Sequence, residues 1–246
     1  TGTTGLRALV TSMSKRRPLE SRRLQDRDFA ILEHLMTYRV TTRDVLHRLF
    51  FSDSDPNAVS KVTTRLNEGG FLTRHELIGS SVYFTLGQAG ARMMGAPARS
   101  VEALGAQTLF TQIGILEFCC GAVQRRNRLS VSLLVKQHPE IMQKGADATR
   151  YVRDGSVTPS VLYVVRVDGG GPNDHVIRKI RNDLDVRIKN PLINSLIQSR
   201  RFGVACITYS EQKKSELDFR IQKEGFPCAV IVEVALILRD LQARFL

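Results

Sequence analysis

Apolar side chains recur at helical spacing near the start of the chain and predict two consecutive helices. The first spans residues 26–38, and its apolar stripe consists of Phe29, Leu32, Leu35 and Met36. The second spans residues 43–50, and its buried side consists of Val45, Leu46 and Leu49. Thr42 lies directly before the second helix and is predicted to cap it, because a threonine hydroxyl accepts a hydrogen bond from a first-turn N–H group.

A third helix and a β-hairpin follow these two helices. The third helix begins at Pro56, which suits the first helical position, and Asp55 before it is a good N-cap. Gly69 and Gly70 end this helix because glycine tolerates the left-handed conformation common at helix C-termini. Two strand-like runs joined by a short polar turn predict the hairpin, over residues 71–77 and 82–86. Three helices and a hairpin in this order are the layout of a winged helix-turn-helix, whose third helix enters the DNA major groove.

The third helix has one apolar and one polar face. Val59, Val62 and Leu66 share the side that packs on the first two helices. The opposite face carries short polar side chains, with Lys61 at its edge: Asn57, Ser60, Thr64 and Asn67. Such side chains form hydrogen bonds to base edges, and a carboxylate among them would repel phosphates. None occurs between Asp55 and Glu68, which indicates a groove-reading surface.

The charge of the chain favours a polyanionic partner. Its formal net charge is +12 and its pI is about 10.0, and contacts between such proteins and phosphates release condensed counterions. Residues 1–23 form a predicted basic, flexible arm. The residues predicted to contact double-stranded DNA are Asn57, Ser60, Lys61, Thr64, Arg65, Arg43, Arg74, His75, Arg16 and Arg17. The alternatives are that these charges are merely solvated, or that a winged helix here mediates protein contacts only.

The rest of the chain alternates strands with helices and predicts an α/β domain. Gly95 and Pro97 mark the boundary, which gives a DNA-binding domain over residues 24–96 and a second domain over residues 97–246. The expected elements are a helix over 101–123, strands over 130–135 and 157–168, a helix over 174–200 interrupted near Pro191, a strand over 202–208, a helix over 211–223 and a strand over 226–234. Glu233, inside the last strand, is expected to lie at an edge or to pair with an arginine.

Several other chemistries find no support in the sequence. The four cysteines form no C-x-x-C pair and the five histidines are scattered, so we expect neither a disulfide framework nor a zinc site. The sequence also shows no Walker motif, no membrane span and no recognisable signal peptide. We therefore expect a cytoplasmic protein with no cofactor, no bound metal and no membrane partner.

A set of landmarks over residues 26–95 resembles the plasmid replication-relaxation protein family. The landmarks are Asp26 to Leu32, Tyr38 to Thr42, Leu49 to Phe51, Arg65-Leu66, Gly70 to Leu72, Tyr83 to Leu86 and Gly90-Ala91. The resemblance implies a winged helix followed by a restriction-endonuclease-like domain, in a protein of a plasmid or integrative element associated with replication, DNA relaxation or conjugative transfer.

The nuclease motif of that family is matched only in part. Asp168 and Lys179 fall where the resemblance expects an aspartate and a lysine, but Ser160 and Arg166 stand where it expects two carboxylates. A metal-dependent nuclease needs at least two carboxylates, because Mg²⁺ prefers oxygen ligands. The resemblance therefore implies a degenerate nuclease-like domain with no catalytic residues, free to dimerise, bind DNA or dock another protein.

Three hypotheses follow. The first is a sequence-specific DNA-binding protein of a mobile element, either an accessory factor in DNA transfer or replication or a transcriptional regulator. The second is a metal-dependent DNA-nicking enzyme, an atypical relaxase or nuclease that uses Asp168. The third is a protein-docking adaptor whose winged helix is idle. The fold class common to all three is α+β or α/β, with an N-terminal winged helix-turn-helix and a C-terminal α/β domain that resembles a degenerate restriction-endonuclease-like fold.

Overall fold

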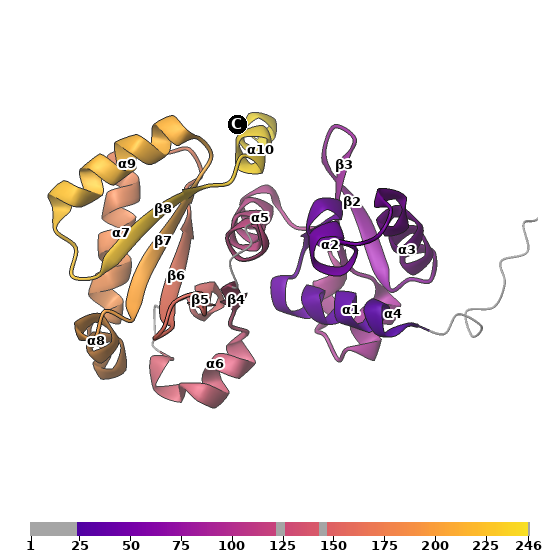
Figure 1. Ribbon diagram of the computed structural model, residues 1–246, viewed down its shortest axis with the longest axis horizontal. Helices are drawn as coiled ribbons and strands as arrows, with labels where there is room; N and C mark the ends of the chain where they lie inside the picture. Colours follow the sequence, from indigo (N-terminus) through magenta and orange to yellow (C-terminus); the bar gives the residue numbers. More distant parts are fainter. Residues whose placement is uncertain (1–23, 122–125, 143–146, 246) are drawn as a thin grey trace, which may run out of the picture.

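The computed structural model describes residues 24–121, 126–142 and 147–245, and the predicted basic arm with Arg16 and Arg17 lies outside them (Figure 1). Over these residues the chain is a mixed α and β structure with ten α-helices and two sheets, one of three strands and one of five. None of the helices in these ranges combines the length and apolar character needed to cross a bilayer.

The first part of the chain surrounds the three-stranded sheet. Its elements are α1 (Asp26–Tyr38), β1 (Thr41–Thr42), α2 (Arg43–Phe50), α3 (Pro56–Glu68), β2 (Leu72–Ile78), β3 (Ser81–Leu86) and α4 (Gln88–Met93). The strands lie antiparallel in the order β1-β3-β2. The three predicted helices and the hairpin are therefore confirmed, and β1 is a short addition that pairs with β3.

The predicted helix boundaries have the expected local chemistry. The Thr42 hydroxyl accepts a hydrogen bond from the backbone N–H of Val45 (3.3 Å), and the Asp55 carboxylate accepts one from Asn57 N (2.7 Å). Gly70 follows α3 with a φ of 71°, a conformation that favours glycine. These contacts satisfy backbone donors that a helix start leaves unpaired, and they fix where α2 and α3 begin.

The predicted apolar face of α3 is buried. Val59 and Leu66 are 2% and 1% exposed, and Val62 is half-buried against the same core. Thr63 is buried as well, and its hydroxyl donates to Val59 O (2.9 Å), so its polar group is satisfied within the helix. Burying each large apolar side chain contributes about 1.5–3 kcal/mol, so this face holds α3 on α1, α2 and the sheet.

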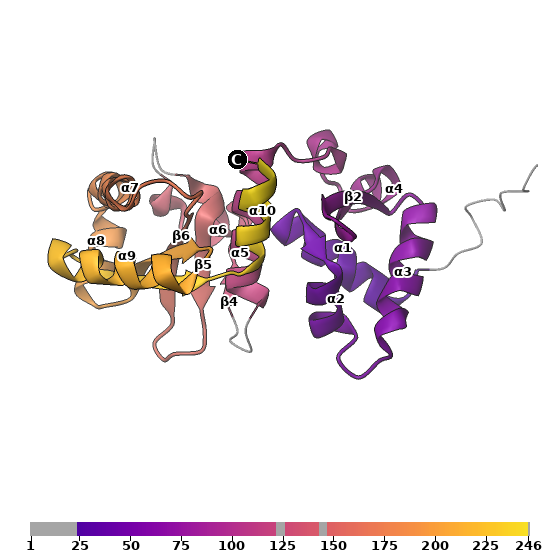
Figure 2. The ribbon, with the colours of Figure 1, turned by 90° about the horizontal axis from the view of Figure 1, so that it is seen from above.

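The second part of the chain is built on the five-stranded sheet. Its elements are the 3-10 helix η2 (Ala98–Val101), α5 (Ala106–Cys120), β4 (Arg126–Arg128), α6 (Val131–Gln137), the 3-10 helices η3 (Pro139–Ile141) and η4 (Ala148–Arg150), β5 (Tyr151–Asp154), β6 (Val161–Val167), α7 (Asn173–Arg187), α8 (Pro191–Gln198), β7 (Phe202–Thr208), α9 (Glu211–Glu224), β8 (Ala229–Val234) and α10 (Ile237–Phe245). The order is β4-β5-β6-β7-β8, antiparallel from β4 to β6 and parallel from β6 to β8. Helices α5 and α10 cover one face, and α7, α8 and α9 cover the other (Figures 1 and 2).

The prediction of a strand over residues 130–135 is wrong. This segment contains α6, whose N-cap Ser130 accepts a hydrogen bond from Leu133 N (3.2 Å). Only Leu134 of α6 is buried, so the apolar run reflects a helix on the surface rather than a strand in the sheet. The strands β4 and β5 were not predicted, because arginine and aspartate occupy several of their positions, and α10 was not predicted either.

The two parts of the chain share a hydrophobic core. Leu77 and Tyr83 of the hairpin are buried in the same cluster as residues of α5 and α10. Backbone carbonyls of the first part also accept hydrogen bonds from the second: Tyr38 O from Arg128 Nη1 (3.2 Å) and Leu77 O from Arg244 Nη1. The hairpin and the end of α1 are thereby held against the five-stranded half.

Candidate nucleic-acid interface

The polar face of α3 is open to solvent. Asn57, Lys61 and Thr64 are exposed, and Ser60 is half-buried. Both views place α3 on the far side of α1 and the small sheet from the five-stranded half (Figures 1 and 2). The structure therefore brings four predicted base-reading residues together on one accessible surface, which we call the α3 face.

The hairpin is fixed to the end of α3 by a side-chain contact. Asn67 Oδ1 accepts a hydrogen bond from the backbone N–H of Arg74 in β2 (3.0 Å). The oxygen of Asn67 is therefore engaged, although the residue is exposed and shares the predicted reading face. The side chain of Arg74 is exposed beside the C-terminal end of α3, where it extends the polar surface of the helix.

Arg65, which the sequence predicts to contact DNA, forms an ion pair within the fold. Its Nη2 donates to Oδ1 of Asp28 at 2.6 Å, and Asp28 is 1% exposed. The other carboxylate oxygen of Asp28 accepts a hydrogen bond from Gln25 N (2.8 Å) at the start of α1. Because a buried carboxylate needs a partner, Arg65 neutralises Asp28 and ties α3 to α1.

His75, which the sequence also predicts to contact DNA, is engaged within the hairpin. Its Nε2 is hydrogen-bonded to Thr85 Oγ1 (3.0 Å), and its ring stacks on Tyr83 with centroids 4.8 Å apart. Burial lowers the pKa of His75, because the surrounding sheet disfavours the charged ring. The imidazole therefore packs on the hairpin as a neutral group and offers no positive charge to a phosphate.

The basic residues of α2 divide between the surface and the junction with the second half. Arg43, at the start of α2, is exposed. Arg48 instead donates to the backbone oxygen of Cys120 at the end of α5. Arg27 of α1, which was not predicted as part of the site, lies over the ring of Phe51 at 4.6 Å. Of these three, Arg43 is therefore the candidate for a phosphate contact.

Three of the four residues aligned with a nuclease motif line one cavity, and Ser160 lies apart from them. Ser160 precedes β6 and Asp168 follows it, so eight residues of extended chain, roughly 25 Å, separate them. Asp168 and Lys179 do line one cavity of about 210 Å³, together with Arg166 and His175. Arg166 pairs with Asp183 (2.5 Å), and no group of three histidine, cysteine or acidic residues able to hold a metal occurs in the described ranges.

The carboxylate of Asp168 is engaged by its own surroundings. Its Oδ1 accepts a hydrogen bond from Gly170 N (3.0 Å), and its Oδ2 accepts one from the hydroxyl of Thr208 (3.2 Å). Asp168 is 4% exposed, so these bonds supply the partners that burial requires. They hold the turn after β6 and join it to β7.

The prediction that Glu233 pairs with an arginine is confirmed. Its carboxylate accepts hydrogen bonds from Nη1 and Nη2 of Arg126 at 2.7 and 2.6 Å. Arg126 also donates to Asp154 (3.1 Å) and lies over the ring of Phe118. Burial opposes the charge of Arg126, but its two carboxylate partners raise its pKa overall. In this group, which we call the Arg126 cluster, Arg126 and Asp154 are buried, Glu233 is partly exposed, and the guanidinium is paired with both carboxylates.

Comparisons with known proteins identify no relative of this chain. A scan against models of protein families, a search of curated proteins and a search of solved structures each found no match to this chain.

Proposed function

We propose that this chain binds double-stranded DNA through a winged helix-turn-helix formed by α1, α2, α3 and the β2–β3 hairpin, with α3 in the major groove. Helix α3 has 13 residues and is therefore about 20 Å long, enough to follow a groove across several base pairs. The main support for this proposal is the exposed α3 face. It presents a lysine among short amide and hydroxyl side chains, on the side of the helix opposite its buried apolar stripe.

The chemistry of the α3 face suits base reading. Asn57 is able to pair with an adenine edge, and Lys61 reaches guanine or phosphate. Asp55 caps the helix start and Glu68 lies in its last turn, so the acidic groups of α3 flank the reading surface rather than interrupting it. We assign phosphate contacts, which position a protein on the duplex without reading its sequence, to the exposed side chains of Arg43 and Arg74.

The hairpin takes part in this proposal through its strand rather than its tip. Leu77, near the tip, is buried against the second half, and Arg244 of α10 holds its backbone oxygen. Arg74, three residues earlier, is the exposed cation beside α3. We therefore assign the backbone contact of the hairpin to Arg74.

The biological setting of the proposal rests on the resemblance described from the sequence. We propose a role on a plasmid or integrative element, as an accessory factor in DNA transfer or replication or as a transcriptional regulator. Mapping bound sites across a plasmid separates these roles: sites at a transfer origin support the first, and sites at promoters support the second.

The decisive experiment is footprinting of the Lys61→Ala/Thr64→Ala double variant on sites mapped with the wild-type protein. A good base contact contributes about 1–3 kcal/mol of discrimination, so preference for the mapped site over scrambled duplex should fall roughly 10- to 100-fold. The control is Lys136→Ala, which removes an exposed lysine from α6 in the other half. An unchanged footprint from the double variant refutes the assignment of α3, and a wild-type protein that shifts no duplex at low salt refutes DNA binding.

A further inference from the structure

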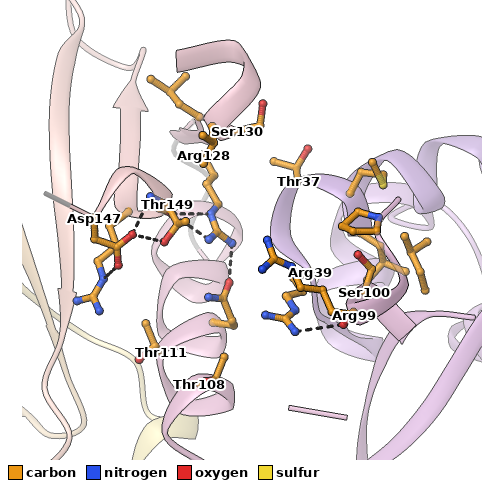
Figure 3. A pocket seen from close by; sticks show the side chains of 18 of the residues that line it. Thr37, Arg39, Arg99, Ser100, Thr108, Thr111, Arg128, Ser130, Asp147 and Thr149 are labelled. Atoms are coloured by element: carbon orange, nitrogen blue, oxygen red, sulfur yellow. Dashed lines mark hydrogen bonds and ion pairs between the residues drawn. The ribbon is translucent and has the colours of Figure 1, made fainter. Parts of the chain in front are cut away.

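A large cleft lies between the two halves of the molecule, away from the α3 face. Its volume is about 570 Å³ (Figure 3). One wall is formed by the end of α1 and by η2, and the other by α5, the end of β4 and η4. A cavity of this size is typical of sites that hold a small organic molecule.

The walls of the cleft carry four arginines and a single carboxylate. The arginines are Arg39, Arg99, Arg128 and Arg150, and the carboxylate is Asp147. Figure 3 shows Arg39 and Arg99 extending side by side from one wall toward α5. Guanidinium groups gathered in one cleft repel each other, and a bound anion would reduce this repulsion.

The only carboxylate on these walls is already neutralised. Asp147 Oδ1 accepts hydrogen bonds from the N–H (2.9 Å) and the hydroxyl (2.6 Å) of Thr149, and Oδ2 accepts one from Arg150 Nε (2.7 Å). Burial would raise the pKa of Asp147, but the Thr149 hydrogen bonds and Arg150 bring it below its ordinary value. Asp147 and Arg150 thus form an ion pair, and among the described residues that line the cleft no further carboxylate is available to Arg39, Arg99 or Arg128.

Arg128 is the most buried of these arginines, at 9% exposure. It donates to three neutral oxygens: Gln112 Oε1 (2.6 Å), Thr149 O (2.9 Å) and Tyr38 O (3.2 Å). Burial lowers the pKa of Arg128, because no anion in contact compensates the cost of removing its charge from water. Within the described ranges, neither Arg39 nor Arg99 forms an ion pair; Arg39 donates only to the backbone oxygen of Arg99 (3.3 Å).

The cleft also offers surface for the uncharged body of a ligand. Apolar side chains from both walls line it: Leu35, Met36, Leu86, Pro97, Leu129 and Val131. The hydroxyls of Thr108 and Thr111 come from α5. Apolar walls with a few convergent polar groups are typical of ligand pockets, and planar guanidinium groups pair with phosphate or carboxylate oxygens in a fork.

We propose that this cleft binds a small organic anion that carries phosphate or carboxylate groups. Arg39 and Arg99 hold the anion directly, and the positive charge of Arg128 attracts it electrostatically. The site is separate from the α3 face and does not depend on the proposed DNA function. Arg128 links Tyr38 at the end of α1 with α5 and η4, so an anion in the cleft contacts both halves of the protein at their junction.

The test is calorimetric titration of the full chain, without DNA, using ADP, citrate and inorganic phosphate as probes and adenosine as the uncharged control. We expect saturable binding of ADP or citrate and none of adenosine. The Arg39→Gln/Arg99→Gln variant should lose at least tenfold in affinity, with unchanged circular dichroism. Arg92→Gln, which removes an exposed arginine of α4 outside the cleft, should bind as the wild type does.

Either of two results in the titration overturns the proposal: no binding by any charged probe at millimolar concentration, or equal binding by the wild type and the double variant. A third result comes from DNA binding. If the wild type binds no small probe and the double variant loses affinity for duplex DNA, the cleft holds DNA phosphates rather than a small anion, and the proposal fails. A failure of DNA binding in both proteins leaves the titration with small anions interpretable, so the two proposals fail separately.

Discussion

The Arg126 cluster and the α3 face use basic side chains in opposite ways. In the cluster, one arginine with a 5% exposed side chain is enclosed by Asp154, Glu233 and the ring of Phe118. On the α3 face, Lys61 is exposed among uncharged polar side chains, and the acidic side chains of α3 lie at the two ends of the helix, Asp55 and Glu68. The first arrangement stabilises the fold and leaves nothing to offer a partner, whereas the second contributes little to the fold and is open to an anion.

The difference shows how far a net charge of +12 can be interpreted. Arg126, Arg65 and Arg187 all appear in the count of basic residues, yet each pairs with a carboxylate inside the fold. The charge available to DNA is set by position rather than by number. Substitutions in the two regions should therefore separate stability from binding.

The largest expected effect is on stability, from Arg126→Met. Removing the guanidinium leaves Asp154 buried without its cationic partner, and breaking a buried ion pair in this way costs about 3–5 kcal/mol. The midpoint of urea unfolding measures the loss, and Arg92→Met, on the surface of α4, is the matched control. A change below about 1 kcal/mol would mean that the cluster is not the structural element described here.

The next effect concerns His34, a buried polar group in the half that carries the α3 face. Burial lowers the pKa of His34 to about 4 from 6.5, and its Nε2 is hydrogen-bonded to Thr41 Oγ1 (3.1 Å). Between pH 6.5 and 4, His34 is protonated in the unfolded chain but not in the folded chain. The free energy of unfolding therefore falls as the pH falls through this window. The loss from this group approaches about 3 kcal/mol near pH 4.

Denaturant titrations at several pH values test this prediction when the His34→Gln variant is included. The variant lacks the titrating ring, so the free-energy difference between wild type and variant should shrink as pH falls from 6.5 to 4. A difference that stays constant with pH would show that His34 is protonated equally in the folded and unfolded chains.

A smaller loss of stability is expected from Arg65→Met. Asp28 would lose its ion pair but keep the Gln25 hydrogen bond, and the Arg65 side chain is 29% exposed, so water would replace part of the contact. We expect a cost of about 2 kcal/mol in unfolding free energy, with duplex affinity changed less than threefold. Asp28→Asn removes the opposite charge of the same ion pair and should also lower the unfolding free energy. A large loss of duplex affinity in Arg65→Met with unchanged unfolding free energy would show that Arg65 contacts DNA.

The first half of the fold was predictable because its signals are local. Asp55, Pro56 and Gly70 fix α3 almost to the residue. The apolar periodicity located α1 and α2 as well, but Phe29, Met36 and Leu49, which it placed on apolar sides, are exposed. The α3 face followed from the same periodicity. The roles of Arg65 and His75 did not, because they depend on Asp28 and Tyr83, neighbours that adjoin them only in the folded chain.

The second half was less predictable for a similar reason. The strands β4 and β5 carry Arg126 and Asp154, residues that local propensity places in loops. Arg126 pairs with Asp154 and with Glu233 of β8, and these contacts form only in the folded chain. The cleft between the two halves had no signal in the sequence. Its arginines are contributed by α1, η2, β4 and η4, elements that meet only when the two halves pack together.

A modest effect is expected on the salt dependence of DNA binding. Contacts with roughly six phosphates give a slope of about −5 in a plot of log affinity against log salt concentration. If Lys61 contacts phosphate, Lys61→Ala should make the slope shallower by about one, whereas Lys136→Ala should leave it unchanged. Fluorescence anisotropy over a range of salt concentrations measures both. Equal slopes for all three proteins would leave Lys61 with a base contact or none.

The smallest expected effect is a null result in a nicking assay with supercoiled plasmid and Mg²⁺ or Mn²⁺. The cavity at the end of β6 contains one carboxylate, Asp168, beside Arg166 and Lys179, and both oxygens of that carboxylate already accept hydrogen bonds. A divalent cation would meet two positive charges and a single acidic ligand there, whereas metal-assisted phosphodiester cleavage needs several oxygen ligands. Nicking that is lost in Asp168→Ala and kept in Lys61→Ala would make the protein an enzyme. It would also show that the second half supplies chemistry as well as structure, and the contrast between the two regions would fail.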